Sequence, residues 1–346
     1  MSKALIAMSG GVDSSVAAHL MLEKGADCIG ATMLLCGDLA PGTGAEDAKA
    51  VADRLNIPFY VFDHTALFRK KVVDAFVQCY EEGGTPNPCL YCNRHLKFDA
   101  LLREALDLGC DHVVTGHYAR IEKDEKTGRF LLKKAADSAK DQSYFLSCLT
   151  QHQLAHTLFP LGDKTKEQVR SIAEAEGFVT AQKKDSQDIC FIPDGDYRSF
   201  LERYTGKDYP AGDYLDLSGK VVGKHNGAVG YTIGQRKGLG IALGEPAYVC
   251  SKNMQANTVT VGPNTALFFK TLIAEDMNWI AIENLTEPMR CKARIRYRHT
   301  EQPATIYPLP DGKAKVEFDE PQRAITPGQT VVLYDGDTVI GGGTII

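Results

Sequence analysis

The stretch AMSGGVDSSVAAHLM at residues 7–21 decides the fold of the first part of this chain. Apolar residues lead into two adjacent glycines, and an alanine-rich helical pattern follows. A glycine turn between a strand and a helix lets backbone N–H groups approach phosphate oxygens. The stretch lacks the Lys-Ser or Lys-Thr pair that ends an ordinary P-loop. It therefore predicts a phosphate-binding loop of another kind, against the alternative of a plain Gly-Gly turn with a polar N-cap.

Strand and helix signals alternate over residues 1–204, where we predict the first domain. Such alternation is typical of an α/β domain with a parallel sheet covered by helices on both faces. Ligands of such sheets bind beyond the carboxyl ends of the strands. The predicted strands are residues 3–8, 28–35, 57–63 and 112–115, and the predicted helices are residues 45–55, 65–82 and 94–108.

The sequence pattern changes after this domain. Glycine, tyrosine and turn signals dominate residues 205–269, which we predict to be a small central domain. Short strands separated by turns fill residues 270–346 and indicate a small barrel or sandwich, for which we expect a C-terminal β-barrel. The predicted strands here are residues 273–282, 289–297, 304–308, 313–318, 330–334 and 338–345.

The composition is that of a soluble globular protein. The 346 residues are 44% hydrophobic and 24% charged, with a net charge of −5. No apolar run approaches the ~18 residues of a membrane span, and the N-terminal apolar stretch is too short for a signal peptide. We therefore expect a cytoplasmic protein with no membrane partner. In that compartment the ten cysteines are expected to be buried, catalytic or metal-binding.

Two cysteine motifs carry the candidate chemistry. TPNPCLYCN at residues 85–93 holds Cys89 and Cys92 in a Cys-x-x-Cys pattern that suits redox chemistry or a metal. No second Cys-x-x-Cys is present, which makes a structural zinc site the weaker alternative. In KKDSQDICFI at residues 183–192, two lysines precede Cys190 and would favour its thiolate. Taken alone, Cys190 beside Phe and Ile would be typical of a core residue.

The segment RCKARIRYR at residues 290–298 is the strongest charge signal. Arginine or lysine occupies every even position, so a strand would carry all five cations on one face. Like charges on one face repel unless a polyanion lies there, which predicts contact with a phosphate backbone. The alternative is a solvated edge strand guarded by charge. The charge for binding a nucleic acid would then be local in a protein that is acidic overall.

SGGVDS at residues 9–14 is similar to the signature of the PP-loop ATP pyrophosphatase superfamily. Together with the cysteine motifs, GHYAR at 116–120, KDQSYF at 140–145 and GYTIGQRKGL at 230–239 extend the likeness along the chain. The sequence thus resembles the bacterial tRNA-specific 2-thiouridylases (tRNA-uridine 2-sulfurtransferases, the MnmA family) from residue 3 to residue 343. The resemblance implies a PP-loop, adenine nucleotide alpha hydrolase-like first domain, with ATP and Mg²⁺ as cofactors and tRNA as substrate.

The resemblance also implies roles for single residues. Residues expected to hold the nucleotide are Ala7, Met8, Ser9, Gly10, Gly11, Val12, Asp13, Ser14, Met33 and Gly116, with Asp13 also near Mg²⁺. Residues expected to contact tRNA are His117, Lys140, Asp141, Gln142, Arg296, Tyr297 and Gln329, with Asn87, Pro88 and Cys89 at the target uridine. Cys92 would be the nucleophile, and Cys190 would carry a persulfide.

The implied reaction is 2-thiolation of the wobble uridine, U34, in tRNAs of the Lys, Glu and Gln type. ATP would adenylylate O2 of this uridine and release pyrophosphate, and the Cys190 persulfide would supply sulfur to C2. Cys92 would complete the release, either by freeing hydrosulfide or by forming a disulfide with Cys190. The sulfur donor would be a cysteine desulfurase, a sulfur-relay protein or sulfide. The base has to leave its stack to reach such a site.

Three alternatives stay open. Many family members carry Asp where this chain has Cys89, so Cys89, Cys92 and Cys190 could hold a [4Fe–4S] cluster whose free iron delivers hydrosulfide. An AMP-forming PP-loop ligase acting on a small carboxylate would leave the cysteines and the basic segment unused. A non-catalytic RNA-binding protein with a zinc or iron–sulfur clip would leave the nucleotide loop unused.

Overall fold

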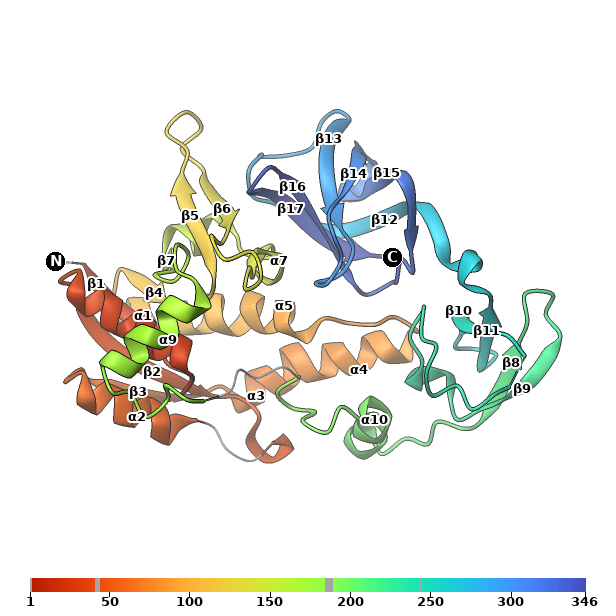
Figure 1. Ribbon diagram of the computed structural model, residues 1–346, viewed down its shortest axis with the longest axis horizontal. Helices are drawn as coiled ribbons and strands as arrows, with labels where there is room; N and C mark the ends of the chain where they lie inside the picture. Colours follow the sequence, from red (N-terminus) through yellow and green to blue (C-terminus); the bar gives the residue numbers. More distant parts are fainter. Residues whose placement is uncertain (1, 41–43, 184–188, 243) are drawn as a thin grey trace.

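The computed structural model describes residues 2–40, 44–183, 189–242 and 244–346. Figure 1 shows an α/β unit at one end and a small β unit at the other. Long helices run between these two units, and a β-barrel that ends at the C-terminus lies above the helices.

The sheet of the α/β unit is parallel throughout, as predicted. Its strands are β1 (Lys3–Ala7), β2 (Asp27–Leu34), β3 (Phe59–Asp63), β4 (His112–Val114) and β7 (Thr157–Leu158), in the order β3-β2-β1-β4-β7. Successive residues of β1 point to opposite cores, with Ala4 and Ile6 on one face and Leu5 on the other. The helices on the first face are α1 (Val12–Glu23), α2 (Ala45–Arg54) and α9 (Lys166–Ala175), and α6 (Leu101–Asp107) covers the second. The prediction of helices on both faces is therefore confirmed.

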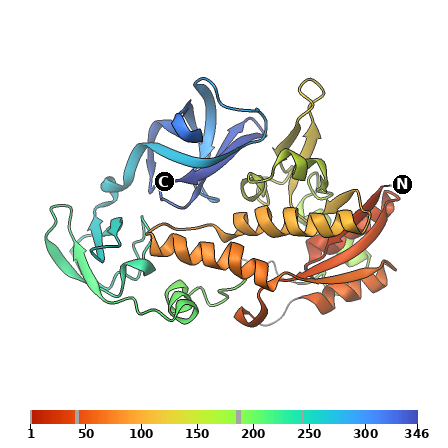
Figure 2. The same ribbon diagram turned by 180° about the vertical axis from the view of Figure 1, so that it is seen from behind.

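Two helical runs extend from this sheet toward the other end of the molecule and lie side by side in Figure 2, where they are orange. The first consists of α3 (Thr65–Phe68), a π-helical stretch η2 (Arg69–Val73) and α4 (Asp74–Glu81). The second consists of α5 (Pro88–Cys92), a π-helical stretch η3 (Asn93–Ala100) and α6. Both were predicted as helices, but the π-helical stretches were not. Such stretches occur often at functional sites.

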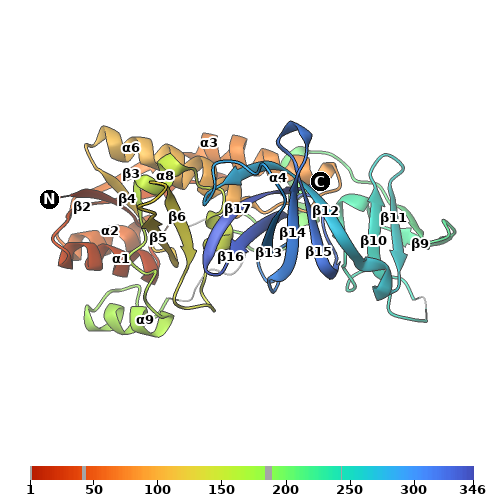
Figure 3. The same ribbon diagram turned by 90° about the horizontal axis from the view of Figure 1, so that it is seen from above.

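The last domain is a closed barrel of six strands, as expected. The strands are β12 (Phe268–Trp279), β13 (Met289–Arg294), β14 (Gln302–Pro308), β15 (Ala314–Arg323), β16 (Thr330–Asp335) and β17 (Thr338–Ile345), and the pairing of β12 with β17 closes the barrel. A hairpin of the first domain, β5 (Ala119–Lys123) and β6 (Phe130–Lys134), extends the same sheet through the pair Thr338 and Lys133. Figure 3 shows this hairpin beside the barrel. The sequence analysis did not predict this hairpin.

The central unit is a sheet of four strands. These are β8 (Gly212–Leu215), β9 (Val221–His225), β10 (Tyr248–Asn253) and β11 (Thr258–Gly262), in the order β10-β11-β8-β9. The remaining helices are α7 (Ser143–Leu146), α8 (Gln151–Ala155) and α10 (Tyr197–Thr205), and short 3-10 turns lie at Gly37–Leu39, Ala228–Gly230, Asn264–Leu267 and Pro310–Gly312. Within the described ranges, no helix is long and apolar enough to span a membrane.

Candidate active site

The glycine loop between β1 and α1 is fixed by close backbone packing. Gly10 has a φ of +67°, and a Cβ there would lie 2.3 Å from the carbonyl oxygen of Gly44. A Cβ on Gly116 would lie 2.7 Å from the backbone nitrogen of Ser14. The loops that contain Gly44 and Gly116 therefore pack closely against the glycine loop and the start of α1. Gly11, at the N-cap of α1, has no side chain to cap the helix. Such a helix start is suited to bind phosphate.

The loop lacks a lysine of its own, but two distant lysines reach it. Lys166, the first residue of α9, donates to both carboxylate oxygens of Asp13 at 2.8 and 2.9 Å, and the hydroxyl of Tyr118 donates to Asp13 at 2.8 Å. Lys183 donates to the carbonyl of Gly10 at 2.9 Å and to Asp47 at 2.7 Å. Lys166 was not predicted at this site, and Lys183 was predicted to act on Cys190. Spacing along the chain gives no signal for contacts between residues so far apart in sequence.

Met33, expected at the nucleotide, and His117, expected to contact tRNA, lie at neighbouring strand ends. Met33 packs between two cores at the end of β2. His117 follows β4, its Nδ1 lies 2.7 Å from Oγ1 of Thr115, and its ring packs against Phe98 and Phe159. Burial, with the charge of Lys97, holds the pKa of His117 well below its ordinary value, so its ring is neutral at pH 7.

Cys89 and Cys92 lie on α5. Cys92 is only 8% exposed, and this burial raises its pKa to about 12. Cys89 is exposed, yet desolvation by the surrounding protein raises its pKa too. The charge of Lys97 on η3 opposes the rise at both thiols. Both side chains are therefore neutral thiols at pH 7 in this structure.

Cys190 is exposed, and its nearest thiol partner is one that the sequence analysis did not name. A hydrogen bond with Cys36 raises the pKa of Cys190 and lowers that of Cys36, and desolvation adds to the rise at Cys190. The thiolate expected at Cys190 is not favoured in this structure, because the hydrogen bond with Cys36 and desolvation raise its pKa, and Lys183 is bound at Gly10 instead. Residues 184–188, which include the second lysine of that motif, lie outside the described residues.

This pairing predicts which disulfide forms first in the enzyme without tRNA. Mild oxidation with diamide should link Cys36 to Cys190, since their thiols are already in contact while Cys92 is buried. Peptide mass spectrometry without reduction should detect this crosslink before one between Cys92 and Cys190. In the Cys36→Ser variant the crosslink should be lost and Cys190 should react faster with iodoacetamide. A dominant Cys92–Cys190 crosslink in the oxidised wild type would contradict the prediction.

Cys89, Cys92 and Cys190 are the possible ligands of a [4Fe–4S] cluster. Among the described residues, no three His, Cys, Asp or Glu side chains form a group that could hold a metal ion. Cys92 is buried in the core that contains Phe191, whereas Cys89 and Cys190 are exposed. The three thiols nevertheless interact electrostatically, since Cys190 raises the pKa of both Cys89 and Cys92. A [4Fe–4S] cluster on these cysteines therefore stays a prediction.

The loop that carries the predicted uridine-binding residues is held by all three domains. The backbone N–H of Thr85 donates to the carbonyl of Pro327 at 2.8 Å, and the side chain of Gln329 donates to the carbonyl of Thr85 at 2.8 Å. The Thr85 hydroxyl donates to that of Thr232 in the central domain at 3.3 Å. Asn87 and Pro88 follow closely, and Asn87 helps to line a small pocket between α5 and the barrel. Gln329, predicted to contact tRNA, is therefore also bound to this loop.

The prediction that five cations share one strand face is wrong, because β13 ends at Arg294 and the chain turns there. Arg290 forms a surface ion pair with Asp319 at 2.8 Å. Arg294 lies on the outer face of the barrel and packs against the first domain, with a side chain only 16% exposed. Arg296 donates to the carbonyl of Arg323 at 3.0 Å. Local charge near the turn remains positive, but it does not form a regular stripe.

The segment 140–142 is placed near that turn. Asp141 is 6% exposed, and its carboxylate accepts hydrogen bonds from Ala135 and Ser143. The side chain of Gln142 accepts from the backbone N–H of Tyr118 at 2.9 Å. The carboxylate of Asp141 is therefore bound within its own loop, and contact of this residue with tRNA stays a prediction of the resemblance.

Three family models together match nearly the whole chain. They are described as the tRNA methyl transferase HUP domain over residues 2–194, the tRNA methyl transferase PRC-barrel domain over 198–263 and the aminomethyltransferase beta-barrel domain over 269–345. The solved structure of the U34-tRNA thiolase NcsA from Methanococcus maripaludis with its [4Fe-4S] cluster is 20% identical and covers 59% of this chain and 67% of its own. Its TM-score of 0.36 is too low for the likeness to carry an argument.

Relatives of known name align from end to end. The tRNA-specific 2-thiouridylase MnmA of Clostridioides difficile is 50% identical over 352 residues, which covers 99% of this chain and 98% of the relative. The protein of the same name from Acetivibrio thermocellus is 49% identical, with 99% of each chain covered. With the glycine loop, the cysteines and the three matched domains in place, the chain belongs to the family of tRNA-specific 2-thiouridylases.

Proposed function

We propose that this chain is a tRNA sulfurtransferase that uses ATP to replace O2 of the wobble uridine, U34, by sulfur. One observation carries the proposal furthest. The glycine loop follows β1, and Cys36, the partner of Cys190, follows the adjacent parallel strand β2. A site for ATP and the thiol pair of Cys36 and Cys190 therefore lie at the same edge of one sheet, where ligands of parallel sheets bind.

The first half-reaction is activation of the uridine. The loop and the start of α1 hold the pyrophosphate part of ATP, and Lys166 and Lys183 supply positive charge beside it. Asp13 accepts two charged hydrogen bonds from Lys166, and the same carboxylate oxygens suit Mg²⁺ when the nucleotide brings the ion. Transfer of AMP to O2 converts this oxygen into a leaving group. The contacts proposed for the nucleotide are those of Ala7, Met8, Ser9, Gly10, Gly11, Val12, Asp13, Ser14, Met33 and Gly116.

The second half-reaction is sulfur transfer. The terminal sulfur of a persulfide on Cys190 attacks C2 of the uridine, and AMP leaves with the former O2. The thiolate of Cys92 then attacks the Cys190 sulfur, which forms a Cys92–Cys190 disulfide and releases 2-thiouridine. A cellular thiol reductant restores both thiols. Because burial raises the pKa of Cys92 to about 12, binding of tRNA has to change its surroundings before this step.

The partners follow from the reaction. The substrate is tRNA of the Lys, Glu or Gln type, contacted through Asn87, Pro88, Cys89, His117, Lys140, Gln142, Arg296, Tyr297 and Gln329. The sulfane sulfur of the persulfide comes from a cysteine desulfurase or a sulfur-relay protein. We place this reaction in the cytoplasm, where tRNA is modified.

The proposal is tested by the dependence of pyrophosphate release on tRNA. Purified enzyme with ATP and Mg²⁺ should release pyrophosphate when unmodified tRNA is added, but not when small carboxylates are added. Mass spectrometry of the digested tRNA should then detect 2-thiouridine once a desulfurase and cysteine are present. Release with a carboxylate alone would favour an AMP-forming ligase.

Cys89→Ser separates the two sulfur routes. Cys89 forms no bond in the persulfide steps, and serine keeps its size and polarity at the proposed contact with the uridine. This variant should therefore keep at least about half of the wild-type rate. The measurement is the initial rate of 2-thiouridine formation with anaerobically purified protein. A loss as complete as that of Cys92→Ser, together with iron and sulfide in the wild-type protein, would favour the cluster route instead.

A further inference from the structure

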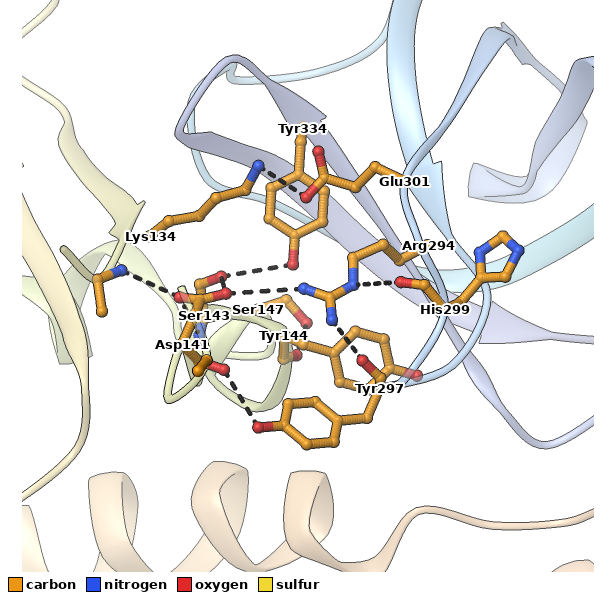
Figure 4. Close-up of polar contacts among 12 residues, drawn as sticks. Lys134, Asp141, Ser143, Tyr144, Ser147, Arg294, Tyr297, His299, Glu301 and Tyr334 are labelled. Atoms are coloured by element: carbon orange, nitrogen blue, oxygen red, sulfur yellow. Dashed lines mark hydrogen bonds and ion pairs between the residues drawn. The ribbon is translucent and has the colours of Figure 1, made fainter. Parts of the chain in front are cut away.

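The guanidinium of Arg294 lies between the barrel and the first domain, between two segments proposed to contact tRNA. Figure 4 shows Arg294 reaching from the barrel toward the loop of the first domain that holds Asp141. Its Nε donates to the carbonyl of His299 at 3.1 Å, and one Nη donates to the carbonyl of Tyr297. Its other Nη lies 3.7 Å from a carboxylate oxygen of Asp141. One side chain thus holds the turn after β13 and also pairs with an acid from another domain.

Asp141 holds its own loop of the first domain in place, as Arg294 holds the turn after β13. One of its carboxylate oxygens accepts from the backbone N–H groups of Ala135 at 3.0 Å and of Ser143 at 3.2 Å. The other accepts from the Ser143 hydroxyl at 2.8 Å and faces Arg294. The carboxylate therefore closes the loop that carries Lys140 and Gln142.

Tyr297 joins the two segments a second time. Its hydroxyl donates to the backbone carbonyl of Asp141 at 3.4 Å, and its ring lies 4.4 Å from the ring of Phe145. The residue before it, Arg296, keeps its guanidinium at the same turn through the carbonyl of Arg323. The proposed tRNA contacts of the barrel are thus packed directly against those of the first domain.

The surroundings of Arg294 explain why a charged group is stable there. Its guanidinium lies 5.8 Å from the ring centre of Tyr144, 5.9 Å from that of Tyr297 and 6.0 Å from that of Tyr334. Aromatic faces at this distance stabilise a cation, and a planar guanidinium can donate to several acceptors in fixed directions. Removing it would leave the 6% exposed carboxylate of Asp141 without its ion-pair partner.

We propose that Arg294 is a positioning residue that holds residues 140–142 and residues 296–297 together as one tRNA-binding surface. This inference rests on the proposed function, since it assigns these segments to tRNA. Arg294 itself does not contact phosphate, because its donors are directed to Tyr297, His299 and Asp141. Its loss should weaken tRNA binding and spare the ATP and sulfur chemistry, which take place on other elements.

The test compares Arg294→Met with Arg294→Lys by steady-state formation of 2-thiouridine. Arg294→Met should raise the KM for tRNA about tenfold while kcat changes less than about twofold, because displacement of binding groups acts on docking. Arg294→Lys keeps a positive charge beside Asp141, so its KM should lie between that of Arg294→Met and that of the wild type. Arg103→Met is the matched control, since Arg103 lies on α6 in an exposed pair with Asp99, and its KM should equal that of the wild type.

The outcomes separate this inference from its alternatives. If Arg294 only stabilises the fold, Arg294→Met should lower the midpoint of thermal unfolding and the active fraction, which reduces kcat and leaves KM unchanged. An unchanged KM in folded Arg294→Met would overturn the inference while the proposed function stands. A wild-type enzyme that forms no 2-thiouridine would overturn the proposed function itself. If Arg294→Met does not fold, an Arg294→Lys enzyme with neither a raised KM nor a weaker tRNA gel shift would overturn the inference.

Discussion

The Cys92→Ser enzyme should form 2-thiouridine at least about a thousandfold more slowly than the wild type, because a catalytic nucleophile is lost. Serine nearly matches the size of cysteine, so the helix end at Cys92 and the surrounding core should keep their packing. A hydroxyl, however, cannot form a disulfide with Cys190 or release sulfur from it. The effect should therefore fall on chemistry and not on folding.

The measurement is a single-turnover time course with enzyme in excess over tRNA, read by mass spectrometry of nucleosides. Pyrophosphate release in the same samples should continue, since activation of the uridine takes place at the glycine loop. Cys250→Ser is the matched control, because Cys250 is a half-buried cysteine of β10 in the central domain. Full activity of Cys92→Ser would overturn the assignment of the nucleophile.

Gly10→Ala should lower tRNA-dependent pyrophosphate release at least about a hundredfold, since small displacements of a catalytic loop have effects of this size. Backbone strain and a steric clash combine at Gly10. Gly10 has a φ of +67°, and the new Cβ would lie 2.3 Å from the carbonyl oxygen of Gly44, which cannot move like a flexible side chain. Either the loop or the start of α2 must shift, and the phosphate-binding backbone shifts with it.

Gly25→Ala separates these two costs. Gly25 follows α1 with a φ of +77°, but a Cβ there would meet nothing within 4 Å. This control carries the backbone strain alone, which costs about 1 kcal/mol of stability. Its pyrophosphate release should stay within about twofold of the wild type. Equal activity of Gly10→Ala and Gly25→Ala would show that close packing at Gly10 has no role in binding the nucleotide.

Local patterns were enough to predict the α/β sheet. β1 and α1 are adjacent in the chain, and both the period of two in β1 and the glycine turn after it are properties of a few neighbouring residues. The strands of the barrel were predicted for the same reason. The end of β13 was not, because alternation continues through residue 298 while the chain itself turns after Arg294.

The sequence by itself determined the parallel sheet, the place of the glycine loop, the barrel and the family. It did not determine the partners of the site residues. Lys166 at Asp13, Cys36 at Cys190 and Asp141 at Arg294 each join residues more than 100 positions apart. A local pattern records which face a side chain occupies, whereas a contact over such a distance exists only after the domains have packed. The tertiary structure therefore decided which thiol Cys190 meets, which lysine binds Asp13 of the glycine loop and which arginine pairs with Asp141.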